Sequence, residues 1–367
     1  MLDRERTLAW RASCQALDAV ENLDASDIVR RVVAMRGWPS NLAEMTVAVR
    51  QTRAEAGALG EALAEGRVIR SYAFRGGSYV FTHEIGALLL SIRTITRVWE
   101  TRRWQQQGGF ALDDWEPLRE EVCAVLASGP KTRDEISAYL ARIPSLNHLT
   151  VGASGAGADS LYKPLHWWGD ICFGPTRDGQ TTFRLLAGDP RWPGPLDVDE
   201  AGRRAIMLYL GAYGPAHFDN LVYWFTEGLG VPRRRLSKWL DDLDGEVEQV
   251  TVGSRLCCVP AAALDALRTA EPLDTVRLLP GFDPWVMGPG TADSDIISSG
   301  RRALASRGNN LVTWRGGVAG TWRTRGAVAE ISWFSEAGPP PTPAIDTEVE
   351  RLGRIQRREL SPTLNLV

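Results

Sequence analysis

The chain has 367 residues, of which 44% are hydrophobic and 24% charged, and its formal net charge at neutral pH is −3. This composition is typical of a globular protein with two or three modules. The charge excludes a histone-like protein, whose affinity for DNA scales with the number of neutralised phosphates. No apolar run approaches the ~18 residues of a membrane span, and the first residues lack the form of a signal peptide, so we expect a cytoplasmic protein with no membrane partner.

The residue types that commonly bind metals show no pattern in this chain. The five cysteines are scattered and never stand in a C-x-x-C spacing, and the four histidines lack a metal-ligand spacing. We interpret the cysteines as reduced core residues. We therefore expect no metal site and no cofactor.

The N-terminal region predicts helices followed by a β-hairpin. Residues 24–27 have the form of a helix cap, and the strands flank a turn at Gly76-Gly77. This order is typical of a winged helix, in which a helix-turn-helix precedes a hairpin called the wing. The predicted helices span residues 28–33, 42–51 and 54–65, and the predicted strands span residues 67–74 and 78–81.

The most informative pattern is a repeated phrase that begins with Gly129-Pro130 and again with Gly214-Pro215. In each copy an acidic residue, Asp134 or Asp219, precedes apolar residues at +2, +5 and +6 from it. This spacing predicts a turn and then a short amphipathic helix with an acid in its first turn. Each copy follows a helical stretch and precedes a hairpin; the helical stretches span 122–126 and 206–210, and the hairpins span 170–185 and 247–259.

The chain after residue 270 has a different pattern. We expect a strand, a hairpin with its turn at Arg315-Gly316-Gly317, and a strand of alternating apolar residues, followed by a stiff proline-rich linker, a helix and a fraying tail. Trp285 and Trp322 are expected to be packing residues. The ranges are 275–280 for the first strand, 310–322 for the hairpin, 328–334 for the third strand, 338–343 for the linker and 344–358 for the helix.

The predicted fold class is therefore α+β, with three tandem winged-helix units and a C-terminal β element. The predicted boundaries are 1–110, 111–195 and 196–270 for the winged helices and 271–367 for the C-terminal element. Winged helices favour a nucleic-acid partner, and we expect a monomer that binds double-stranded DNA. The candidate DNA-binding residues are Arg75, Arg233, Arg234, Arg235, Lys238, Arg315, Arg323 and Arg325. Arginine suits bidentate phosphate and base contacts, although such clusters are as often solvated faces.

The Gly-Pro repeats, the segment Leu279-Pro280-Gly281-Phe282-Asp283 and the segment Gly317–Trp322 together resemble the AlkZ-like and YcaQ-like bacterial DNA glycosylases. The resemblance covers nearly the whole chain. It implies three winged helices around duplex DNA with a C-terminal β element. It also implies excision of bulky alkylated purines, which gives antibiotic producers resistance to their own DNA-damaging products.

The catalytic motif of that family is replaced in this chain. The family carries Gln-x-Gln or Gln-x-Asp, which holds a water and stabilises the sugar cation, where this chain has Arg36-Gly37-Trp38. A guanidinium opposes positive charge that develops on the sugar, and it neither accepts a hydrogen bond nor serves as a base. A second family motif, Arg-Gly-Thr-x-His, keeps Arg75-Gly76 here but has Tyr79 in place of the histidine.

Two carboxylates are candidate substitutes for the missing motif. Glu44 lies in the next predicted helix and Glu84 follows the first wing, and the alternative is that both are exposed acids on helix faces. Trp38 could stack on a base or on a planar drug, although a core position is more common for tryptophan.

We therefore predict a DNA-binding protein of this family that recognises alkylated or bulky-adduct DNA, in DNA repair or antibiotic resistance, without the family's excision motif. The alternatives are a non-catalytic transcriptional regulator and a cleft that binds a planar small molecule. If the chain is an enzyme, the reaction is DNA base excision by an N-glycosyl hydrolase.

Overall fold

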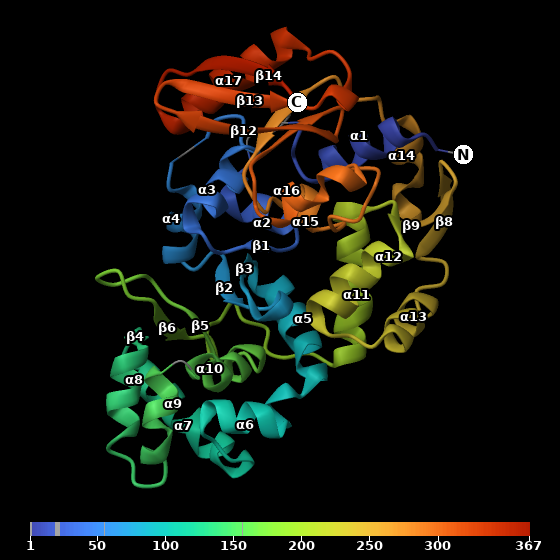
Figure 1. The fold of residues 1–367 in the computed structure, drawn as a ribbon. Coiled ribbons are helices and arrows are strands. Elements are labelled where there is room, and N and C mark those ends of the chain that lie inside the picture. Colours follow the sequence, from blue (N-terminus) through green and yellow to red (C-terminus); the bar gives the residue numbers. More distant parts are fainter. Residues whose placement is uncertain (1, 19–22, 55, 156) are drawn as a thin grey trace. The chain divides into compact units, whose positions relative to one another are not determined.

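The computed structural model describes residues 2–18, 23–54, 56–155 and 157–367, which form a mixed α+β fold (Figure 1). The α+β class expected from the sequence is confirmed. The chain separates into two compact units, and each is built from segments that are distant in sequence. Unit 1 comprises Met1–Ala62, Ile206–Phe225 and Ser237–Val367, and unit 2 comprises Leu63–Ala205 and Thr226–Leu236.

Helices and short strands alternate along most of the described chain. The α-helices are α1 (Arg4–Cys14), α2 (Ala25–Arg31), α3 (Ser40–Ala48), α4 (Ala58–Ala64), α5 (His83–Arg93), α6 (Arg102–Gly108), α7 (Trp115–Leu126), α8 (Arg133–Leu140), α9 (Thr150–Ser154), α10 (Ala158–Trp167), α11 (Val198–Tyr213), α12 (Phe218–Leu221), α13 (Arg233–Asp241), α14 (Leu264–Thr269), α15 (Pro284–Met287), α16 (Arg302–Ser306) and α17 (Thr342–Gln356). The strands are β1 (Met35–Arg36), β2 (Ile69–Tyr72), β3 (Ser78–Phe81), β4 (Lys131–Thr132), β5 (Ile171–Phe173), β6 (Thr182–Leu185), β7 (Ala216–His217), β8 (Val247–Val252), β9 (Arg255–Pro260), β10 (Val276–Leu279), β11 (Leu311–Trp314), β12 (Gly317–Arg325), β13 (Val328–Trp333) and β14 (Ser361–Leu366).

The hairpins expected from the turn residues are confirmed. β2 pairs antiparallel with β3, β5 with β6, β8 with β9, and β11 with β12. The first hairpin differs in detail, because β2 ends at Tyr72 and a 3₁₀ turn with Arg75 at φ 50° closes it. The predicted cap of the first N-terminal helix is also confirmed, since the Asp24 side chain accepts a hydrogen bond from the backbone N–H of Asp27.

The two Gly-Pro phrases form the same local structure. Each leads into a two-residue strand, and each strand joins the following hairpin, giving the sheet orders β4-β6-β5 and β7-β9-β8. Each strand then enters a helix through a capping box, formed by Thr132 with Glu135 and by His217 with Asn220. The acids Asp134 and Asp219 do not close these capping boxes. The closing side chains, Glu135 and Asn220, stand one residue later in each copy. The division of the chain into three winged helices stays a prediction.

The C-terminal part of unit 1 is a five-stranded sheet in the described chain, with the order β10-β11-β12-β13-β14. α17 packs on this sheet through Ile345, Val349 and Leu352, and both are drawn in orange and red in Figure 1. The expectation that the tail frays was wrong, because Ser361–Leu366 forms β14 and pairs parallel with β13. This pairing satisfies backbone groups that would otherwise lie on an open sheet edge.

The two tryptophans of the family-like segments are packing residues, as expected. Trp285 is 1% exposed and its Nε1 donates to the carbonyl oxygen of Gly316, and Trp322 is 6% exposed and donates to that of Leu279. Each indole therefore ties one element of unit 1 to another. No helix in the described ranges is both long enough and apolar enough to span a bilayer.

Candidate functional site

The segment between α2 and α3 exposes two large side chains. Met35 is 1% exposed, Arg36 is exposed, Gly37 is buried and Trp38 is 68% exposed. Arg36 ends the short strand β1, and Trp38 lies in the bend that leads into α3. Both sequence-predicted motif positions therefore lie on the surface of unit 1, where they provide a guanidinium and an indole.

Arg36 is stacked on an aromatic ring from a distant part of unit 1. Its guanidinium carbon lies 4.2 Å from the ring centroid of Phe282, a cation–π geometry. Phe282 has φ 62°, a left-handed conformation that is uncommon for a bulky residue. Gly308 makes room for the Phe282 ring, which a Cβ on Gly308 would overlap, and a Cβ on Gly281 would overlap the carbonyl oxygen of Gly308. The loop that carries Phe282 is thus held closely in place.

The residue after Phe282 anchors this loop in the core. Asp283 accepts two hydrogen bonds from Arg50, at 2.9 Å from Nη1 and 2.7 Å from Nη2, and both side chains are almost fully buried. Arg50 also donates to the carbonyl oxygens of Gln15 and Thr46, so four of its donor contacts are satisfied. A buried ion pair of this kind is stable only when its remaining hydrogen bonds are also made. Arg50 is not among the residues predicted from the sequence, and the one available signal was Asp283 at the end of the segment Leu279–Asp283.

The first candidate substitute, Glu44, is engaged at a helix terminus. Its carboxylate accepts hydrogen bonds from the backbone N–H groups of Gly60 (2.7 Å) and Leu59 (3.2 Å), at the start of α4. These N–H groups belong to the first turn of the helix and have no partner within it. Both oxygens of Glu44 are therefore used to cap α4.

The second candidate substitute, Glu84, lies in unit 2, in the first turn of α5. It is exposed, and the described residues offer it no hydrogen-bond or ion-pair partner. An acid in the first turn interacts favourably with the helix dipole. Its position therefore has a structural explanation that needs no catalytic role.

The hairpin between β2 and β3 carries the altered second motif. Arg75 lies in the turn and pairs with Glu227 at 3.4 Å, and both side chains are largely exposed. The ring of Tyr79, which the sequence resemblance aligns with the family histidine, packs against Phe74 with the ring centroids 4.8 Å apart. The Lys163 amine also approaches this turn, since it lies 3.1 Å from where a Cβ on Gly76 would be. Both cations are paired with acids, because Lys163 contacts Asp159 at 3.1 Å and its side chain is only 17% exposed.

Most of the other candidate DNA-binding residues are paired with acids on their own surface. Arg235 contacts Asp199 at 2.7 Å, Lys238 contacts Asp242 at 3.3 Å, Arg315 contacts Asp274 at 3.3 Å, and Arg323 and Arg325 share Glu330 at 2.6 and 3.4 Å. An acid at this distance offsets the positive field that a phosphate would experience. These residues are therefore partly neutralised.

Arg233 and Arg234 differ from that group. Both are exposed and neither has an ion pair or hydrogen bond among the described residues. They begin α13, at the helix end whose partial charge is positive, where arginine is unfavourable and acids are preferred. Their charge is therefore fully available, and their position is not explained by helix stability.

Among the described residues no three His, Cys, Asp or Glu side chains form a cluster that could hold a metal ion. The five cysteines are free, and Cys172, Cys257 and Cys258 are buried as expected, whereas Cys14 and Cys123 are half-buried.

Comparison with known proteins places these observations in a family. A family model described as "DNA glycosylase AlkZ-like" matches residues 29–355. An interstrand DNA cross-link repair glycosylase of Streptomyces sahachiroi is 29% identical over 358 residues, which is 95% of each chain. The solved structure of the Streptomyces sahachiroi DNA glycosylase AlkZ superposes with a TM-score of 0.93 at 28% identity, covering 100% of both chains.

Proposed function

Because the chain belongs to the AlkZ-like DNA glycosylase family, as its motifs predicted, we propose that it binds duplex DNA with alkylated or bulky-adduct bases and recognises the lesion without excising it efficiently. Its biological role would be DNA repair or resistance to DNA-damaging antibiotics. The observation that carries this proposal is the exposed pair of side chains, Arg36 and Trp38, where the resemblance expects the family's catalytic motif.

The chemistry of this pair opposes base excision. Breaking the bond between base and sugar places positive charge on the sugar, and the Arg36 guanidinium would raise the free energy of that transition state. Neither side chain can activate a water, because a guanidinium is always protonated and an indole has only an N–H donor. Glu44, the closest candidate acid in sequence, uses both oxygens to cap α4.

The same pair suits recognition of a base. Trp38 is the most exposed of the chain's described tryptophans, at 68%, and an indole surface left in water is available for stacking. Stacking of a base on an aromatic side chain contributes about 1–3 kcal/mol to binding. Arg36, held in place by Phe282, would contact the adjacent phosphate. An open surface of this kind supports a nucleic-acid partner over a planar small molecule enclosed in a cleft.

We propose that the remaining DNA contacts come from three winged-helix units with the boundaries 1–110, 111–195 and 196–270, followed by the β element 271–367. The repeated order around each Gly-Pro phrase supports this division: a helix precedes the phrase, and a short strand, a capped helix and a hairpin follow it. Arg233 and Arg234 are the leading phosphate contacts because they have no acidic partner among the described residues. The further proposed contacts are Arg75, Arg235, Lys238, Arg315, Arg323 and Arg325.

The decisive experiment compares binding and excision on one duplex containing a single N7-methylguanine. We expect tighter binding to this duplex than to the unmodified duplex, and release of the base no faster than its spontaneous loss. Rapid turnover that is abolished by Glu44→Ala or Glu84→Ala would contradict the proposal and establish a rewired glycosylase. Equal affinity for modified and unmodified duplex, with strong dependence on base sequence, would indicate a transcriptional regulator instead.

A further inference from the structure

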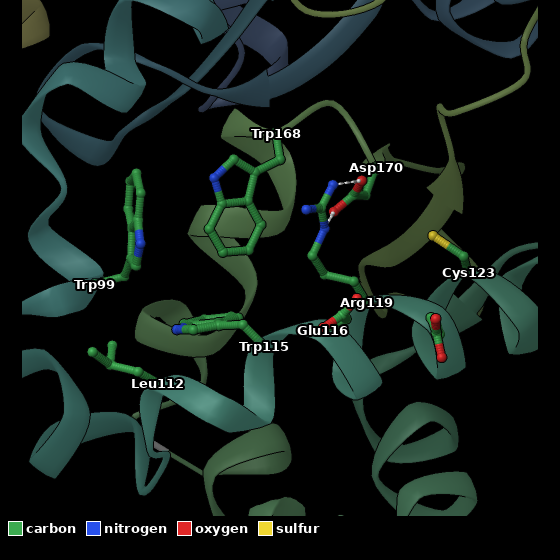
Figure 2. Close-up of a pocket in the computed structure, with 9 residues that line it drawn as sticks. Trp99, Leu112, Trp115, Glu116, Arg119, Cys123, Trp168 and Asp170 are labelled. Atoms are coloured by element: carbon green, nitrogen blue, oxygen red, sulfur yellow. Dashed lines mark hydrogen bonds and ion pairs between the residues drawn. The ribbon is translucent and has the colours of Figure 1, made fainter.

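Unit 2 contains an open pocket of about 610 Å³ whose walls are largely indole rings (Figure 2). Trp99 comes from the 3₁₀ turn Val98–Glu100, Trp115 is the first residue of α7, and Trp168 follows α10. The volume lies in the range of small-molecule sites in proteins. The pocket is lined by Trp99, Leu112, Trp115, Glu116, Arg119, Glu120, Cys123, Trp168 and Asp170.

The Trp168 ring stands nearly perpendicular to each of the other two indoles. The Trp99 and Trp168 rings have centroids 5.2 Å apart at an angle of 78°, and Trp115 and Trp168 are 5.0 Å apart at 87°. Edge-to-face packing of this kind is a favourable arrangement of aromatic rings. Figure 2 shows Trp99 and Trp168 standing upright, with Trp115 lying below them. The pocket therefore has rigid walls of different orientation.

The charged groups around these walls leave a net negative charge. Arg119 donates to both oxygens of Asp170, at 2.7 and 2.8 Å, and these two charges offset each other. Glu116 and Glu120 lie one turn apart on α7, are exposed, and have no partner within the part of the chain that is described. Burial raises the pKa of the Cys123 thiol, so this side chain adds no charge. Two free carboxylates thus border an aromatic surface.

Two further features of the pocket wall bear on the kind of ligand that it can bind. The Arg119 guanidinium, itself a planar cation, lies 4.8 Å from the centroid of the Trp168 ring. The Trp115 indole is 7% exposed, and its Nε1–H has no hydrogen-bond partner among the described residues. In Figure 2 this nitrogen is at the end of the ring nearer Leu112, which is 47% exposed. The pocket wall therefore contains a buried N–H group for which the described residues supply no acceptor.

We propose that this pocket binds a small organic cation with a flat aromatic body. The indole faces and edges would hold the aromatic part, and Glu116 and Glu120 would attract its positive charge. Cations bind aromatic faces most strongly where they are partly removed from water. The two free carboxylates repel phosphate, so the pocket is a site separate from the proposed DNA contacts. The proposal does not depend on whether the chain excises bases.

The test is calorimetric titration of the full chain with N-methylquinolinium, a flat cation, and with quinoline, which has nearly the same shape and is neutral at mildly alkaline pH. We expect saturable binding of N-methylquinolinium at one site per chain and binding of quinoline that is weaker by about tenfold. Equal affinity for the two molecules, or no heat from the cation at millimolar concentration, would overturn the proposal.

Variants locate the binding within the pocket. Glu116→Gln combined with Glu120→Gln removes the two charges at exposed positions, and we expect affinity for the cation to fall by about fivefold or more. The matched control is Glu121→Gln on the same helix, whose carboxylate accepts a hydrogen bond from Tyr139 and does not line the pocket. An unchanged affinity in the double variant, or an equal loss in the control, would show that the cation binds elsewhere. DNA affinity measured on the same samples should be no weaker in the double variant.

Discussion

Arg50 and Asp283 form a buried bidentate ion pair, with side chains 0% and 1% exposed, that joins the end of α3 to the loop carrying Phe282. The pair connects residues far apart in sequence but within unit 1. Arg50 follows the helix that comes after Arg36 and Trp38, and Asp283 is next to Phe282, the ring on which Arg36 stacks. The geometry of the candidate site therefore depends on a contact in the core.

The first prediction concerns this ion pair. Arg50→Ala leaves the Asp283 carboxylate buried without its partner, and we expect the free energy of unfolding to fall by about 3–5 kcal/mol. Urea denaturation followed by circular dichroism measures the change. Arg53→Ala, at an exposed position three residues later, is the control and should change stability by less than about 0.5 kcal/mol. A loss below about 1 kcal/mol in Arg50→Ala would mean that the pair is not what anchors the loop.

The second prediction concerns Trp38 as a stacking surface. Trp38→Ala removes the exposed indole, and we expect binding to a duplex with one N7-methylguanine to weaken by about 1–3 kcal/mol. Fluorescence anisotropy with a labelled duplex gives the affinity. Val151→Ala shortens another exposed apolar side chain, at 82% exposure, and should leave the affinity unchanged. If Trp38→Ala also binds normally, the indole does not contact the lesion.

The third prediction concerns the altered motif. Arg36→Gln with Trp38→Gln restores the family's side chains at these two positions, yet we expect excision of N7-methylguanine to stay at the spontaneous rate. The reason is that Tyr79, which packs against Phe74, is aligned by the sequence resemblance with the family histidine and cannot replace it as a base. Adding Tyr79→His tests this second requirement. Efficient excision by the two-residue variant alone, measured as released base, would show that Tyr79 is not limiting.

The fourth prediction concerns the start of α13. Arg233→Glu with Arg234→Glu should weaken DNA binding and reduce its salt dependence, by roughly one unit of logarithmic slope for each phosphate that the variant no longer neutralises. Arg102→Glu with Arg103→Glu, at two exposed residues of α6, makes the same charge change and provides the control. Anisotropy titrations at several salt concentrations give both quantities. Affinity and slope equal to those of the control would identify Arg233 and Arg234 as solvated surface.

The fifth prediction concerns pH and His166. Complete burial lowers the pKa of this imidazole from 6.5 to about 3, and its Nδ1 is 2.8 Å from the Ser71 hydroxyl. Between pH 6.5 and pH 3, His166 is therefore protonated in the unfolded chain but not in the folded chain. Stability consequently falls as the pH decreases from about 6.5 towards 3. The contribution is up to about 1.4 kcal/mol per pH unit. Denaturation curves of His166→Phe should show a shallower loss over this range, and an equally steep loss would assign it to other groups.

Features that depend on neighbouring residues were predictable from the sequence. The four hairpins followed from their turn residues, and the alternation in β13 matches its alternating burial. The family followed from several short segments, such as Leu279–Asp283, because together they extend the resemblance over nearly the whole length of the chain. The assignment of the altered motif to Arg36 and Trp38 rests on residue identity in the sequence and stays a prediction.

Other features depend on contacts between residues distant in the chain, and only the tertiary structure decided them. Glu44 is suited to acid–base chemistry by type, but the start of α4 takes both of its oxygens. The C-terminal tail has little tendency to form structure by itself, and it becomes β14 because β13 offers an unpaired edge. Trp99, Trp115 and Trp168 meet around one pocket although no local pattern links them. Turns and the alternation of apolar residues are set by a few adjacent residues. Each of these contacts, in contrast, joins residues far apart in the sequence, and it exists only when folding brings both of them together.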